Sequence, residues 1–83
     1  MISSEDGWLY TYEYDAGDRA CGDLIFDLRF FFQPLPAESR VRVTALDPSA
    51  PVDLTAWCRS TGHKLVDWHH PYYLIEKRAN KPT

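Results

Sequence analysis

The spacing of the apolar residues changes along the first half of the chain, and this change limits the fold more than any other feature. Apolar side chains first occupy every second position, at Trp8, Tyr10, Tyr12 and Tyr14. This alternation predicts a half-buried β-strand. The strand ends at residues 15–18, which are typical of a turn. From Asp23 the apolar residues follow helical spacing instead, and Pro34 stops the helix near Gln33. The first half of the chain therefore predicts a strand followed by a helix.

The second half of the chain repeats this order and then adds a hairpin. Residues 40–45 alternate between apolar and polar and predict a strand with one wet face. A helix is expected next, with Asp47 or Ser49 as its cap, Pro51 in its first turn and Gly62 at its left-handed end. Two short strands, 63–68 and 72–77, are separated only by residues 69–71, which predicts an antiparallel hairpin.

The resulting order is βαβαββ, an α/β (α+β) two-layer sandwich. It has a four-stranded mixed sheet, and right-handed crossovers place both helices on one face. A chain of 83 residues forms one domain, with an ordered core over about 8–77 and a tail from Arg78 that we expect to fray.

Charge and composition narrow the classes of function. The formal net charge of −3 argues against direct binding of nucleic acid, which depends on phosphate contacts. Residues 1–7 are acidic and contain no apolar stretch, so we predict no signal peptide. No apolar run is long enough to span a membrane, and two widely separated cysteines do not form a secreted disulfide framework. These features predict a cytoplasmic protein without a membrane partner or cofactor.

Cys21 is the main candidate for a reactive residue because it lies between the predicted first strand and the predicted first helix. Free backbone N–H groups at a helix start favour a thiolate, which is the reactive form of cysteine. Arg19 is a candidate ion-pair partner for that sulfur, or alternatively a solvated loop charge. Gly22 leaves the sulfur less covered than a bulky neighbour would but adds backbone freedom, and Asp23 places an opposing negative charge two residues away.

The other potential ligands have simpler interpretations. Cys58 shares a helical face with Leu54 and Trp57, so we expect it to pack in the core rather than to act as a resolving thiol. The three histidines and two cysteines match no familiar zinc spacing, and no metal site is predicted. The aromatic stripe of the first strand is core if it faces the helices, and a partner-binding patch if it lies on the open sheet face.

Several segments together resemble the TusA (SirA-like) sulfur-carrier family. The likeness covers nearly the whole chain and is strongest from Val41 to Lys77. There the segments 43–50, 53–58 and 62–66 look like the second half of that family at its usual spacing. The distance from Asp15 to Cys21 also matches. The family reads Cys-Pro-x-Pro at the helix start, whereas this chain reads Cys21-Gly22-Asp23-Leu24.

The resemblance implies a fold, a function and partners. The family's sheet places the fourth strand between the second and third. Its members carry sulfur as a persulfide on the first cysteine, which corresponds to Cys21. They receive the sulfur from a donor such as a cysteine desulfurase and pass it to a downstream acceptor protein, which is sulfurtransferase-like chemistry. The alternative function is a non-catalytic interaction or regulatory domain that kept the scaffold and lost sulfur transfer.

Overall fold

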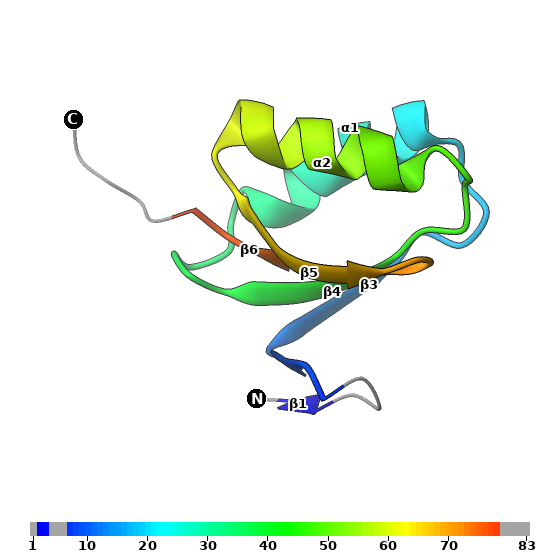
Figure 1. Cartoon of the computed structure of the whole chain (residues 1–83). Coiled ribbons are helices and arrows are strands. Elements are labelled where there is room, and N and C mark those ends of the chain that lie inside the picture. Colours follow the sequence, from blue (N-terminus) through cyan, green and yellow to red (C-terminus); the bar gives the residue numbers. More distant parts are fainter. Residues whose placement is uncertain (1, 4–6, 79–83) are drawn as a thin grey trace.

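The computed structural model describes residues 2–3 and 7–78, and places two helices over one face of a sheet (Figure 1). The elements, in chain order, are β1 (Ile2–Ser3), β2 (Leu9–Tyr10), β3 (Tyr12–Asp15), α1 (Cys21–Phe32), β4 (Arg40–Thr44), α2 (Ala50–Thr61), β5 (Lys64–His69) and β6 (Tyr72–Glu76). Neither of these helices is long and apolar enough to cross a membrane.

The main sheet has the order β3-β4-β6-β5. β3 pairs in parallel with β4, whereas β6 pairs antiparallel with both β4 and β5. β6, the last strand in the sequence, therefore lies between β4 and β5, which are the second and third of the four predicted strands. This arrangement confirms the predicted βαβαββ fold, including the short hairpin that joins β5 to β6.

The ends of both helices follow from local chemistry. α1 stops at Phe32, and the ammonium group of Lys77 donates to the carbonyl oxygens of Phe32 (2.5 Å) and Gln33 (3.1 Å). A cation is favourable there because the last carbonyls of a helix carry partial negative charge. Gly62 ends α2 with a φ of 83°, and its N–H donates to Cys58 O at 2.9 Å. The predicted left-handed glycine is thus confirmed.

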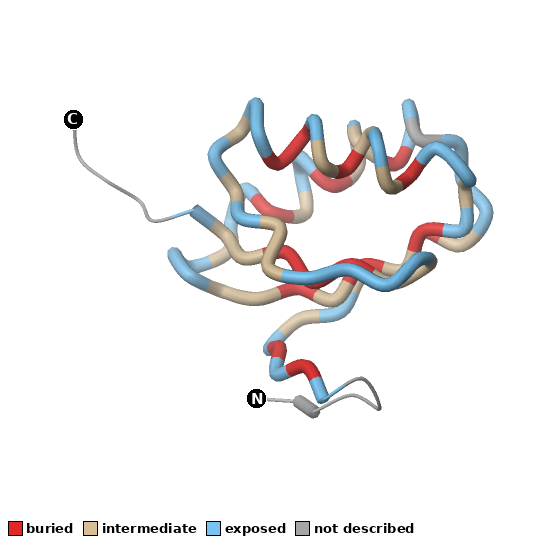
Figure 2. Tube along the Cα trace, viewed as in Figure 1, coloured by how far each residue is buried: buried red, intermediate tan, exposed pale blue. Residues whose placement is uncertain are grey.

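The core fills the space between the helices and the sheet, where the buried stretches of the chain face one another (Figure 2). The helices contribute Leu24, Leu28, Phe32, Leu54 and Trp57, and the sheet contributes Val41, Val43, Tyr73 and Ile75. The rings of Phe32 and Trp57 meet edge to face, with centroids 5.2 Å apart. This aromatic pair joins the two helices above the sheet.

The prediction of one continuous first strand was wrong, because the strand divides at Thr11. Tyr12 and Tyr14 pack against the main core, as the alternation predicts. Trp8 and Tyr10 instead pack with Leu74 in a second, smaller cluster. Leu74 alternates along β6 with the core residue Tyr73, so this cluster lies on the sheet face away from the helices.

Specific polar contacts hold the second cluster together. The Trp8 indole N–H donates to Asp67 Oδ2 at 3.1 Å. The Arg42 guanidinium lies 4.2 Å from the ring centroid of Tyr72 and donates to Glu13 Oε1 at 2.9 Å. The aromatic stripe is therefore divided between two faces, and its first half is buried against residues of β5 and β6 instead of forming an open patch.

The C-terminal segment is described only as far as Arg78. The guanidinium of this residue donates to Thr61 O at 2.9 Å, and its backbone N–H donates to His63 Nδ1 at 3.0 Å. Residues 79–83, the rest of the tail expected to fray, lie outside the described residues.

Candidate functional site

Cys21 is the first residue of α1, as its position between strand and helix predicts. Ala20 precedes it in an extended conformation, with φ −63° and ψ 148°. The helical hydrogen bond nearest the start of α1 runs from Leu24 N to Ala20 O at 3.0 Å. The amide groups of residues 21–23 come before this bond, at the end of the helix that attracts negative charge. The Cys21 side chain itself lies outside the described residues.

The loop that leads into Cys21 is fixed by hydrogen bonds at its base. Asp15 Oδ1 accepts the Gly17 N–H at 2.8 Å, and Gly17 adopts a left-handed φ of 59° that suits glycine. Leu46 N donates to Gly17 O at 3.1 Å, which ties this loop to the segment after β4. The edge of the sheet therefore holds the start of α1 in position.

Arg19, the predicted partner of the sulfur, contacts other groups in the structure. Its guanidinium forms an ion pair with Asp27 and a hydrogen bond of 3.2 Å with the Tyr14 hydroxyl. Burial raises the pKa of Tyr14, and the Asp27 carboxylate adds to this effect, so the hydroxyl keeps its proton. The Arg19 and Asp27 side chains are 53% and 40% exposed, and an ion pair this exposed contributes little stability.

A shallow groove begins beside the predicted site, between the two helices. It has a volume of about 500 Å³ and is lined by Gly22, Ile25, Asp53, Ala56, Trp57 and Ser60. A Cβ atom built at Gly22 would meet nothing within 4 Å, so there is open space at Gly22, the residue that follows Cys21. Asp53 adds a second carboxylate to the one that Asp23 supplies in the first turn of α1.

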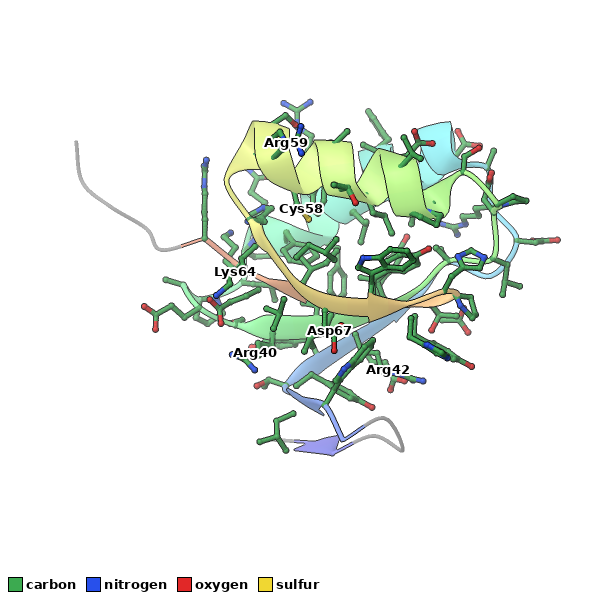
Figure 3. All side chains as sticks on the ribbon, in the orientation of Figure 1. Arg40, Arg42, Cys58, Arg59, Lys64 and Asp67 are labelled. Atoms are coloured by element: carbon green, nitrogen blue, oxygen red, sulfur yellow. The ribbon has the colours of Figure 1, made fainter. Side chains whose placement is uncertain are left out.

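Cys58 is buried in the core beside Leu54 and Trp57, which confirms the prediction made from its helical face. Its side chain points from α2 into the layer between the helices and the sheet (Figure 3). Burial raises the pKa of Cys58 to about 12. A thiol in this environment keeps its proton at neutral pH and reacts slowly.

His63 lies near the C-terminal ends of the two helices, in contact with aromatic rings. Its ring centroid is 5.0 Å from that of Phe32 and 5.1 Å from that of Trp57. Burial, together with the smaller effect of the positive charges of Lys77 and Arg78, lowers the pKa of His63 to about 4. His63 is therefore neutral at physiological pH. No group of three or more potential metal ligands occurs within the described part of the chain.

The sequence analysis did not anticipate a larger groove near His63, which brings together Arg29 from α1 with Lys77 and Arg78 from the C-terminal end of the chain. Its sequence signal is weak, because these residues are far apart in the chain and basic residues near helix ends are common.

Comparison with known proteins adds no family assignment. No protein-family model matches the sequence, and no curated protein is significantly similar to it.

Proposed function

We propose that this protein carries sulfur as a persulfide on Cys21. The observation that carries the proposal is the position of Cys21 as the first residue of α1, where free amides and the helix dipole favour an anionic sulfur. Two further features support it. The order β3-β4-β6-β5, with both helices on one face, is the arrangement that the resemblance to the TusA family implies. The space at Gly22, the residue that follows Cys21, is also open.

The transfer needs no cofactor and no net oxidation. The Cys21 thiolate attacks the terminal sulfur of a persulfide on a donor protein. A new S–S bond forms to Cys21 Sγ, the donor's S–S bond breaks, and the donor cysteine leaves as a thiolate. An acceptor thiolate then removes the same sulfur by the reverse exchange. The partners are thus a donor such as a cysteine desulfurase and a sulfur acceptor, in a reducing compartment such as the cytoplasm.

Loading of sulfur tests this proposal. The protein is incubated with a cysteine desulfurase and cysteine, and its intact mass is then measured without reductant. We expect the wild type and Cys58→Ala to gain the mass of one sulfur atom, and Cys21→Ser to gain none. Loading of Cys21→Ser, or no loading of any form, would contradict the proposal. The second result would favour the non-catalytic interaction domain, which shares the scaffold without needing the thiol.

The charge of Asp23 should slow the reaction of Cys21. Asp23→Asn removes a carboxylate from the first turn while keeping the shape of the side chain, so it should favour the thiolate. We expect the alkylation rate of Cys21 with iodoacetamide near pH 8 to rise about two- to fivefold. Glu38→Gln is the matched control, because it makes the same charge change at an exposed position beyond the far end of α1. Equal rates in both variants would show that Asp23 does not influence the cysteine.

A further inference from the structure

A second groove lies between the C-terminal ends of α1 and α2 and residues 77–78, which follow β6. It has a volume of about 970 Å³. Its apolar lining consists of Ile25, Phe30, Phe32, Leu35, Pro36, Ala37 and Trp57. Its polar lining consists of Arg29, Gln33, Ser60, Thr61, His63, Lys77 and Arg78. The groove thus combines an aromatic and aliphatic surface with several hydrogen-bonding groups.

The charge of this groove differs in sign from that of the chain. Among the residues that the structure describes, Arg29, Lys77 and Arg78 line it and no aspartate or glutamate does, although the chain has a net charge of −3. Lys77 and Arg78 donate to carbonyl groups at the ends of α1 and α2, which offsets the partial negative charge of those helix ends. Arg29 adds a further positive charge at an exposed position. The groove is therefore complementary to an anionic ligand.

The two grooves adjoin along the line where the helices meet. Both are lined by Ile25, Trp57 and Ser60, so the surface runs from Gly22 at one end to Arg78 at the other. Along α1, the distance from Gly22 to Phe32 is about 15 Å at the helical rise per residue. About five residues of an extended chain span this length. The shape suits a strand-like segment better than a compact small molecule.

Exposed aromatic side chains extend this surface outward. Phe26 and Phe30 are 60% and 57% exposed, and their rings contact each other with centroids 5.1 Å apart. Phe30 also lines the larger groove, beside Arg29. Aromatic residues and arginine are among the types enriched at protein interfaces, so this part of the surface suits a protein partner.

We propose that these adjoining grooves bind an extended segment of a partner protein, with its carboxylates beside Arg29, Lys77 and Arg78 in the larger groove. Apolar side chains of the segment lie on the aromatic surface, toward the Gly22 end that Asp53 lines. Because the groove reaches Gly22, a bound segment ends next to Cys21. The proposal rests on the proposed function in one respect, since it assigns this segment to the sulfur donor or acceptor. The binding itself requires no sulfur chemistry.

Binding is tested with defined peptides on the Cys21→Ser variant, so that failure of sulfur transfer cannot affect the result. The probe is a fluorescein-labelled octapeptide of alternating aspartate and leucine. Its binding to the protein is measured by fluorescence anisotropy at low salt. The matched probe has lysine in place of aspartate. A single-stranded oligouridylate of the same length tests whether the cations bind phosphate instead. Amide chemical shifts locate the peptide on the protein.

The decisive variant is Arg29→Glu, because Arg29 does not cap either helix. Its control is Arg59→Glu, which reverses a charge in the last turn of α2, on the outer side of that helix (Figure 3). We expect Arg29→Glu to weaken binding of the acidic peptide at least tenfold and Arg59→Glu less than twofold. The changes in amide chemical shift that the acidic peptide causes should centre on Ile25, Trp57 and Ser60.

Four outcomes would overturn the proposal. They are no binding of the acidic peptide, equal losses in the two arginine variants, binding of the lysine peptide at similar strength, and tighter binding of the oligouridylate. Peptide binding without sulfur loading would support the groove and count against the proposed function. Sulfur loading without peptide binding would support the proposed function and count against the groove as a peptide-binding site.

Discussion

Phe32→Ala should lower the free energy of unfolding by about 3–5 kcal/mol, as expected for truncation of a fully buried aromatic residue. The Phe32 ring is 1% exposed and packs against both Trp57 and His63, so alanine would leave a cavity where the two helices meet. Such a loss is a large part of the stability of a small domain. Urea unfolding followed by circular dichroism measures it.

Phe30→Ala is the matched control, since it removes the same side chain from the same helix two positions earlier. Phe30 is 57% exposed, and we expect a change of no more than about 0.5 kcal/mol. Similar losses in the two variants would mean that the aromatic run of α1 is not divided between core and surface as described.

Cys58 should be almost inert toward iodoacetamide in the folded protein. Burial raises its pKa from 9.0 to about 12, so its thiolate fraction near pH 8 falls about a thousandfold relative to an exposed thiol. The Cys21→Ser variant, in which Cys58 is the remaining cysteine, isolates this reaction. Its alkylation, followed by mass spectrometry, should be about a thousandfold slower in buffer than in concentrated urea.

The same measurement on the Cys58→Ala variant gives the alkylation rate of Cys21, with which the rate of Cys58 is compared. Rapid alkylation of Cys58 in the folded state would contradict its place in the core, and would make it a second candidate for the reactive thiol.

The order of elements could be predicted because each carries its own local signal. Helical spacing in α1 ends before Pro34, Gly62 marks the end of α2, and only the two residues 70–71 join β5 to β6. The position of Cys21 at the start of α1 followed from the same change in spacing. These signals depend on neighbouring residues, which a single sequence displays directly.

The remaining features depend on contacts between distant residues. Alternation could not show that the first strand divides at Thr11, because Trp8 and Tyr12 share the same spacing but pack on opposite faces of the sheet. The contact of Lys77 with the end of α1 joins residues 45 positions apart. The basic groove arises in the same way, since the fold brings Arg29 next to the C-terminal end of the chain.

The most direct test of the central claim is to locate the transferred sulfur. After loading with a cysteine desulfurase and cysteine, the protein is alkylated and digested with trypsin, which places Cys21 in the peptide 20–29 and Cys58 in the peptide 43–59. We predict an alkylated persulfide in the peptide 20–29, and its disappearance when an acceptor thiol is added before alkylation. Sulfur found only in the peptide 43–59, or in neither peptide, would contradict the assignment of Cys21 as the sulfur carrier.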